Sequence, residues 1–304
     1  SASSIVTAGA NPVFADVELD SQNISRRTIE AVLTPKTKAI ICVHLAGWMC
    51  DMDPIMQLAE EKGIWVIEDC AQAHGAFYKG QSAGSIGHIG AWSFCQDKIM
   101  TTGGEGGMVT TNDENLWKKM WSYKDHGKNF DSIYNKQHPP GFRWLHDSFG
   151  TNWRMMEMQA VIGRLQLQKM PEWTQVRNAH MRRVLASFEN NPYFTVPMPP
   201  ANYVHAAYKA YVQVNTAQLP EGWSRDRIMA EINALGVPCF SGSCSEVYLE
   251  KAFDGTPWRP EQRLVNAKSL GDSSLMFLVH PTLSDSNMQK TVDSIQQVIS
   301  QISM

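Results

Sequence analysis

The chain has 304 residues, of which 43% are hydrophobic and 19% are charged, a composition that allows a substantial core and excludes general disorder. A formal net charge of -3, with no run of Lys or Arg, gives no electrostatic footprint for nucleic acid or anionic lipid. No segment has the apolar length of a membrane span, and the first ten residues lack the basic and apolar regions of a signal peptide. We therefore expect a cytoplasmic protein that acts on small molecules and contacts neither nucleic acid nor membrane.

Cysteine and histidine spacing gives no support for a metal site. There is no CxxC pair and no HxxxH or HExxH pattern, so we expect free thiols in a reducing compartment and no metal. His74, His126 and His280 are expected to be hydrogen-bonded structural residues rather than catalysts. The six cysteines are Cys42, Cys50, Cys70, Cys95, Cys239 and Cys244.

The first half of the chain has the pattern of a parallel α/β sheet. Residues 38–45 and 64–70 are apolar, β-branched runs typical of strands that are covered on both faces. Between them, Asp53 marks a helix start and Gly63 is placed to end the helix. Strand, helix and strand at this spacing predict a right-handed βαβ unit.

The rest of the chain predicts further strands and helices in a fixed order. Helical periodicity between Met155 and Phe188 contains Pro171, which we expect to break or kink the helix. We place the domain boundary at that proline, which gives a large domain of residues 1–171 and a small α+β domain of residues 172–304. The other predicted elements are strands at 91–94, 107–111 and 210–214 and helices at 114–123, 225–235 and 285–302.

Ligands of open parallel sheets bind beyond the carboxyl ends of the strands, and two charged residues lie at such positions. Asp69 ends one predicted strand, although an isolated Asp there is more often a helix cap. Lys98 lies between another predicted strand and the glycines of residues 103–107, which permit close backbone approach. A nicotinamide-dependent dehydrogenase is disfavoured, because residues 103–107 (GGEGG) lead into a strand and no GxGxxG turn opens a helix.

Six segments resemble the DegT/DnrJ/EryC1/StrS family of sugar aminotransferases. Agreement of many separate segments in order is more specific than any one short motif. The resemblance implies the pyridoxal-phosphate-dependent transferase fold type I, with a mostly parallel sheet flanked by helices. The segments are residues 8–24 (AGANPVFADVELDSQNI), 43–53 (VHLAGWMCDMD), 66–76 (VIEDCAQAHGA), 93–98 (SFCQDK), 103–113 (GGEGGMVTTND) and 150–167 (GTNWRMMEMQAVIGRLQL).

The resemblance assigns a role to five residues. Lys98 matches the lysine that binds pyridoxal 5'-phosphate covalently and then transfers protons as acid and base. Asp69 matches the carboxylate that pairs with the pyridine nitrogen, Gln72 the contact to the ring hydroxyl, and Ser93 a phosphate ligand. Asn152 matches a residue that contacts the phosphate in the neighbouring subunit. We therefore expect a homodimer with shared active sites.

The resemblance also implies the reaction. We expect transfer of an amino group from an amino acid, glutamate, to a nucleotide-linked keto sugar in polysaccharide, lipopolysaccharide or glycoside biosynthesis. Family members that dehydrate sugars carry histidine at the position of Lys98, so the lysine favours transamination. A sugar dehydratase, another fold type I enzyme and a non-catalytic descendant remain the alternatives. Trp48, Met49 and residues 239–248 differ from the residues usual in the family, so the sugar, its ring position and the nucleotide stay open.

Family members also have an earlier stretch that supplies a helix N-terminus for the phosphate and an aromatic residue stacked on the pyridine ring. We expect this chain to be N-terminally incomplete and to begin just before a strand at residues 8–17. Because a helix start and ring stacking both favour binding, a chain extended upstream is expected to hold the cofactor more tightly.

Overall fold

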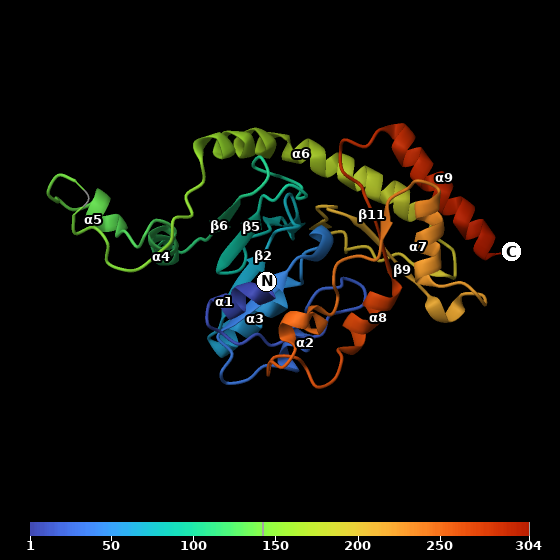
Figure 1. The fold of residues 1–304 in the computed structure, drawn as a ribbon, viewed down its shortest axis with the longest axis horizontal. Coiled ribbons are helices and arrows are strands. Elements are labelled where there is room, and N and C mark those ends of the chain that lie inside the picture. Colours follow the sequence, from blue (N-terminus) through green and yellow to red (C-terminus); the bar gives the residue numbers. More distant parts are fainter. Residues whose placement is uncertain (142, 304) are drawn as a thin grey trace.

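A four-stranded sheet with the order β1-β2-β5-β6 forms the centre of one half of the molecule (Figure 1). In the computed structural model, which describes residues 1–141 and 143–303, β1 (Ala39–Val43), β2 (Trp65–Asp69) and β5 (Ile89–Ser93) are parallel. The edge strand β6 (Gly107–Thr110) is antiparallel to β5. The sheet is therefore largely parallel, as the sequence predicts.

Helix α3 (Met52–Lys62) connects β1 to β2 and confirms the predicted βαβ unit. It ends at Gly63, whose φ of 63° lies in the left-handed region that glycine adopts without strain. The helix buries Ile55 and Leu58 completely against the sheet. The opposite face of the sheet, which carries Ile67, is only half-buried among the described residues. The expectation that the strands are covered on both faces is met on one face only.

The second half of the molecule contains an antiparallel sheet with the order β10-β11-β9-β7. Helices α7 (Arg225–Ala234) and α9 (Asp285–Ile302) pack with this sheet in a separate hydrophobic core. The predicted strand at 210–214 and the predicted helices at 225–235 and 285–302 are confirmed. The four strands are β7 (Phe194–Thr195), β9 (Ala210–Val214), β10 (Cys239–Phe240) and β11 (Ser274–Phe277).

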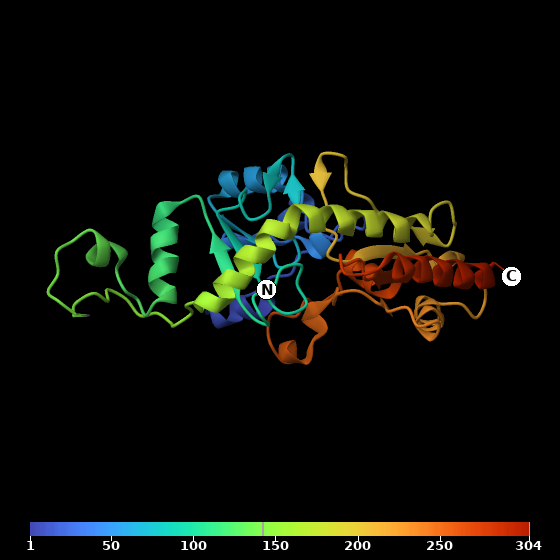
Figure 2. The ribbon, with the colours of Figure 1, turned by 90° about the horizontal axis from the view of Figure 1, so that it is seen from above.

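Helix α6 (Glu157–Ala186) runs along both halves and contributes to both cores. Pro171 lies inside this 30-residue helix, which continues through the proline with a visible bend (Figure 2). The expected break is therefore wrong, whereas the expected kink is observed. The proline is exposed, and Met170 and Met181 anchor the helix in the two cores on either side of it, so tertiary packing outweighs the lost backbone hydrogen bond. The domain boundary at residue 171 stays a prediction.

Residues 113–141 and 143–153 form an arm that projects from the first half (Figure 1). The arm contains α4 (Glu114–Lys124) and α5 (Phe130–Tyr134), neither of which has a buried residue. Its aromatic rings pack against one another, with the Trp117 and Phe130 centroids 4.9 Å apart. The arm thus lies outside both hydrophobic cores of the described chain.

The N-terminal segment contains helix α1 (Ala2–Thr7), and the predicted strand at residues 8–17 is wrong. Asp16 accepts backbone hydrogen bonds from Asn266 and Ala267, in the first turn of α8 (Val265–Ser273). These contacts hold the segment against a distant helix, so it joins no sheet.

The remaining elements are short. A small sheet has the order β4-β3-β8. No helix in the described part of the chain is both long and apolar enough to cross a membrane. The short elements are α2 (Arg26–Glu30), β3 (Phe77–Tyr78), β4 (Gln81–Ser82), β8 (Tyr203–Val204) and the 3-10 helices η1 (Leu45–Gly47), η2 (Thr216–Gln218), η3 (Val247–Leu249) and η4 (Lys251–Phe253).

Candidate active site

The carboxyl ends of β1, β2 and β5 meet at one edge of the parallel sheet. Asp69 is the last residue of β2 and Ser93 is the last residue of β5. The two strands are adjacent, with Asp69 opposite Ala91, two residues before Ser93. The structure thus brings these two predicted site residues to the same edge.

The Asp69 carboxylate is half-buried and accepts two hydrogen bonds. The backbone N–H of Ala71 donates to Oδ1 over 3.1 Å, and the Ser1 hydroxyl donates to Oδ2 over 2.6 Å. Because each carboxylate oxygen has two lone pairs, the group keeps the capacity to accept a further proton donor.

Gln72 holds the turn that follows β1. Its side-chain oxygen accepts a 2.6 Å hydrogen bond from the backbone N–H of Ala46. This turn also contacts a distant loop, since Ala206 donates to the Gly47 carbonyl and Tyr208 donates to the Ala46 carbonyl. With its oxygen occupied, the amide NH2 of Gln72 is the group left to contact a ligand.

Lys98 lies in the loop after β5 with 18% of its side chain exposed. Its Nζ is 3.4 Å from the Asp97 carboxylate and 5.6 Å from the centre of the Tyr208 ring. The Tyr208 hydroxyl donates to the other Asp97 oxygen over 2.8 Å. Burial opposes ionisation of Asp97, but the Tyr208 hydrogen bond and the Lys98 charge together hold its pKa below the ordinary value. The carboxylate therefore positions both the amine and the tyrosine.

The loop that carries Lys98 is fixed from both ends. The Ser93 hydroxyl accepts a 3.4 Å hydrogen bond from the backbone N–H of Cys95. Further along, Gly106 has a φ of 157°, and a Cβ there would lie only 2.2 Å from the Thr102 hydroxyl oxygen. Glycine is thus required where the loop returns to the sheet.

A buried carboxylate lies behind the strand ends. Glu68 is fully buried, and its two oxygens accept hydrogen bonds from His44 Nε2 and three backbone N–H groups. Burial raises the pKa of Glu68, but the His44 hydrogen bond and charge and the backbone donors outweigh that effect and leave it lowered. The three backbone donors are those of Gly84, Ile86 and Gly87.

His44, Glu68 and Cys70 together have the residue types of a metal site, with one candidate ligand atom of each within 4.8 Å of the others. However, His44 uses its second ring nitrogen, Nδ1, to accept from the backbone of Cys50. Both histidine nitrogens and both Glu68 oxygens therefore have protein partners, which identifies the group as a structural network.

His74 differs from expectation. Its buried ring packs against Trp92 and Phe94, and neither ring nitrogen has a hydrogen-bond partner among the described residues. Burial, followed by the Lys98 charge, lowers the pKa of His74 to about 4. The prediction of a hydrogen-bonded histidine is wrong here, whereas His280 does contact Thr282 Oγ1 at 2.7 Å.

Asn152 lies apart from the other four predicted site residues. It is exposed on the arm, where it forms a β-bridge with Asp125, and no hydrogen bond joins it to the described strand ends. Asp125 itself is paired with Arg154 at 2.6 Å, which fixes this part of the arm. Lys98 thus lies in the loop that follows Ser93 at the end of β5, whereas Asn152 lies on a projecting element.

Sequence reasoning missed Asp97 and Tyr208. Asp97 is adjacent to Lys98 in a segment that resembles the family, so the sequence could have indicated it. The second lies 111 residues further along the chain than Asp97, and no local pattern connects the two.

The donor set fits pyridoxal phosphate. An amine, a carboxylate, a hydroxyl and an amide at one sheet edge match the aldehyde, ring nitrogen, phosphate and ring hydroxyl of that cofactor. Together with the parallel sheet and its crossover helix, these groups have the chemistry that a transferase of fold type I requires.

Comparison with known proteins gives the family. The model of the DegT/DnrJ/EryC1/StrS aminotransferase family matches residues 1–296. GDP-perosamine synthase from Caulobacter vibrioides is 33% identical over 98% of this chain and 76% of its own length. The spore coat polysaccharide biosynthesis protein SpsC from Bacillus subtilis is 30% identical over 98% of this chain and 76% of its own length.

Solved structures agree with the sequence match. An aminotransferase from Psychrobacter cryohalolentis superposes with a TM-score of 0.98 and 62% identity, covering 99% of this chain and 78% of its own. DesV from S. venezuelae, solved with a ketimine intermediate, has a TM-score of 0.85 and 26% identity, covering 98% of this chain and 75% of its own. This chain belongs to the DegT/DnrJ/EryC1/StrS aminotransferase family, and its cofactor is pyridoxal phosphate. The predicted family, fold class, cofactor and enzyme class are confirmed.

Proposed function

We propose that this aminotransferase transfers an amino group from glutamate to a keto sugar linked to a nucleotide. The observation that carries the proposal is the Lys98 amine, held beside Asp97 and Tyr208 in the loop after β5, next to the strand end that bears Asp69. The names of relatives support the sugar substrate. Besides GDP-perosamine synthase, they include a dTDP-3-amino-3,4,6-trideoxy-alpha-D-glucose transaminase from Streptomyces venezuelae, which is 27% identical over 96% of this chain and 72% of its own length.

In this proposal, pyridoxal phosphate supplies an aldehyde and an electron-withdrawing ring when it is bound. Asp69 would accept a hydrogen bond from the ring nitrogen, and this charge-assisted contact would keep that nitrogen protonated. Ser93 would contact the phosphate, and the amide NH2 of Gln72 would contact the ring hydroxyl. Each of these groups lies on a strand end or a turn that other hydrogen bonds hold in place.

Lys98 is the residue that moves protons. Its amine would hold the cofactor and would act as the acid and base that moves a proton at the substrate carbon. Asp97 supports the amine during this step, because it is fixed by Tyr208 and lies 3.4 Å from Nζ. The Lys98 side chain keeps 18% of its surface exposed, as contact with a substrate requires.

We also propose a homodimer with shared sites. The arm exposes large apolar side chains, among them Phe149 with 99% and Trp144 with 86% of its surface exposed. Apolar groups of this size gathered on one projecting element favour an interface with another chain. A second copy of this chain would cover them, and its Asn152 would reach the phosphate of the facing site.

The reaction is tested by incubating the enzyme with glutamate and a panel of nucleotide-linked keto sugars, and by identifying products by mass. An aminated nucleotide sugar together with 2-oxoglutarate is the expected result. A dehydrated sugar, or amination of free keto acids alone, would contradict the proposal. Repeating the assay with glutamine or aspartate as the only donor tests the choice of glutamate.

A further inference from the structure

Two cations near the active site lack an acidic partner. Arg177, in α6, is only 5% exposed, donates one long hydrogen bond of 3.4 Å to the Ala207 carbonyl, and has no partner for its buried Nε. Lys209 is half-buried two residues after Ala207. Among residues 1–141 and 143–303, no carboxylate oxygen lies within 4.0 Å of either cationic group. An unpaired buried charge is strongly unfavourable, so this arrangement calls for an anion.

Lys209 and the amine of Lys98 both lie near the Tyr208 ring. The Nζ of Lys209 is 4.7 Å from the centre of the Tyr208 ring, and Lys98 Nζ is 5.6 Å from the same ring. The nearest acid, Asp97, is already engaged by Lys98 and Tyr208. Burial and the Arg177 charge lower the pKa of Lys209, and burial lowers the pKa of Arg177 to about 10. The local charge is therefore positive and lacks compensation.

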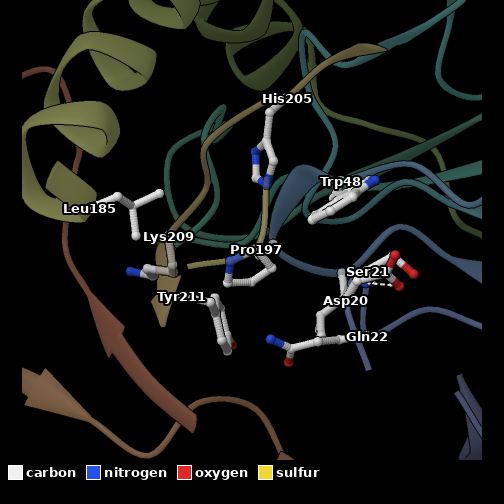
Figure 3. A pocket seen from close by; sticks show the side chains of 11 residues that line it. Asp20, Ser21, Gln22, Trp48, Leu185, Pro197, His205, Lys209 and Tyr211 are labelled. Atoms are coloured by element: carbon white, nitrogen blue, oxygen red, sulfur yellow. Dashed lines mark hydrogen bonds between the residues drawn. The ribbon is translucent and has the colours of Figure 1, made fainter. Parts of the chain in front are cut away.

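Lys209 also borders a pocket between the two halves of the molecule (Figure 3). Lys209, Tyr211 and Leu185 lie on one side of this pocket, and Trp48 and Ser21 lie on the opposite side. Lys209 is the cation that lines the pocket, whereas Arg177 does not line it. Other charged groups around it do not neutralise Lys209, because Asp20 lies across the pocket and accepts from the backbone of Ser21.

We propose that Arg177 and Lys209 form a carboxylate-binding site that orients a substrate toward Lys98. The planar guanidinium presents paired N–H donors that match the two oxygens of a carboxylate, and the lysine adds a second charge. Such a group has two sources in a transamination: the amino-acid donor, or an acidic sugar that accepts the amino group. This inference rests on the proposed function, because it presumes substrates of that kind.

Binding of unreactive probes tests the site without turnover. Glutarate, UDP-glucuronate and the neutral UDP-glucose are titrated into the holoenzyme by calorimetry. Lys209→Met is expected to weaken binding of one acidic probe roughly tenfold or more, as expected for loss of a charged hydrogen-bond partner, and to leave UDP-glucose unchanged. Lys36→Met, at an exposed lysine remote from the pocket, is the matched control and should bind all probes like the parent.

Arg177→Lys provides the second variant, since it keeps the charge but loses the paired donors. It should weaken the same probe as Lys209→Met, with circular dichroism and cofactor absorbance unchanged. If only the binding of glutarate is weakened, the site binds the amino donor. If only the binding of UDP-glucuronate is weakened, the site binds an acidic sugar. The proposal is overturned if neither acidic probe binds the parent enzyme, or if Lys209→Met binds both like the parent.

The same variants separate this inference from the proposed function. If no keto sugar is aminated but glutarate binding depends on Lys209, the function fails and the carboxylate site stands. If Lys209→Met aminates sugars with the same half-saturation concentrations for glutamate and acidic sugars as the parent, the proposed function stands. The carboxylate site is then disproved. A real site raises the half-saturation concentration of its substrate more than it lowers the maximal rate.

Discussion

Lys98 is the residue on which the proposed chemistry depends, and its surroundings explain how one lysine is singled out. It is mostly buried, faces the Tyr208 ring and has Asp97 within 3.4 Å. Exposed lysines such as Lys36 have no comparable setting. We therefore propose that selectivity for the cofactor aldehyde comes from the position of Lys98 in the loop after β5 rather than from the amine alone.

We predict that borohydride reduction of the holoenzyme followed by peptide mapping places a pyridoxyl group on Lys98. Lys98→Ala should lose the reducible chromophore and at least a thousandfold in activity, since no other described amine is held in this loop. Label on a different lysine would contradict the assignment.

Glu68 supports the site from behind, and its loss should affect stability. In Glu68→Gln, an amide NH2 would face the donors of Gly84 and His44, so we expect a loss of about 2–4 kcal/mol in the free energy of unfolding. Urea unfolding of both proteins at pH 7 measures the difference.

The pH dependence of that difference follows from the lowered pKa of Glu68. A carboxyl whose pKa is lower in the folded state stabilises the fold above its unfolded pKa, and this contribution is lost as the pH falls through the folded value. The difference in the free energy of unfolding between the parent and Glu68→Gln should therefore be constant near neutral pH. It should decrease as the pH falls below the ordinary pKa of a carboxyl group. A gap that widens in acid would contradict the network.

At the scale of elements, the turn after β1 joins the sheet to the loop that carries Tyr208. Gly47 has a φ of 96°, and a Cβ there would lie 2.6 Å from the Ala206 Cβ. A side chain at this position would push apart the turn held by Gln72 and the loop that positions Asp97 and Lys98. Glycine is needed here for both conformation and space.

Gly47→Ala should consequently lose most activity and more than about 2 kcal/mol of stability, because the backbone strain and the clash act together. Gly80→Ala is the matched control, since Gly80 also has a positive φ of 83° but nothing lies within 4 Å of a Cβ there. The control should lose about 1 kcal/mol and keep its activity. Equal effects in the two variants would show that the close approach to Ala206 is unimportant.

At the scale of the whole molecule, the arm and the two cores have different roles. The cores fix the strand ends and the loop that faces them, whereas the arm contributes no residue to either core and exposes its aromatic side chains. In the proposed homodimer, a second chain covers these side chains, and the shared site gives the exposed Asn152 a function.

We predict complementation between two inactive proteins. Lys98→Ala and Asn152→Ala, mixed under conditions of subunit exchange, should recover up to about a quarter of the parent activity per site, since half of the chains pair as heterodimers and one of the two sites in each heterodimer carries neither substitution. Sedimentation of tagged chains measures exchange. Exchange without any recovery would show that each chain holds a complete site.

Local sequence signals determined many of the helices and strands of this protein, and its family. Gly63 ends α3 because only a residue that tolerates a positive φ fits there, and α9 has the predicted bounds, Asp285–Ile302, with Ser284 as its cap. The apolar runs gave β1 and β2, and the ordered motifs around Asp69 and Lys98 gave the family. These signals act over a few residues, so they are readable without coordinates.

Contacts between distant residues were decided only by the tertiary structure. Packing of α6 into both cores carries the helix through Pro171, and hydrogen bonds to α8 hold residues 8–17 out of any sheet. The pairing of Asp97 with Tyr208, and the approach of Arg177 to the loop before Lys209, join segments that share no pattern in the sequence. The sequence therefore determines the local elements and the cofactor chemistry, whereas the surroundings of Lys98 depend on long-range packing that only the folded chain creates.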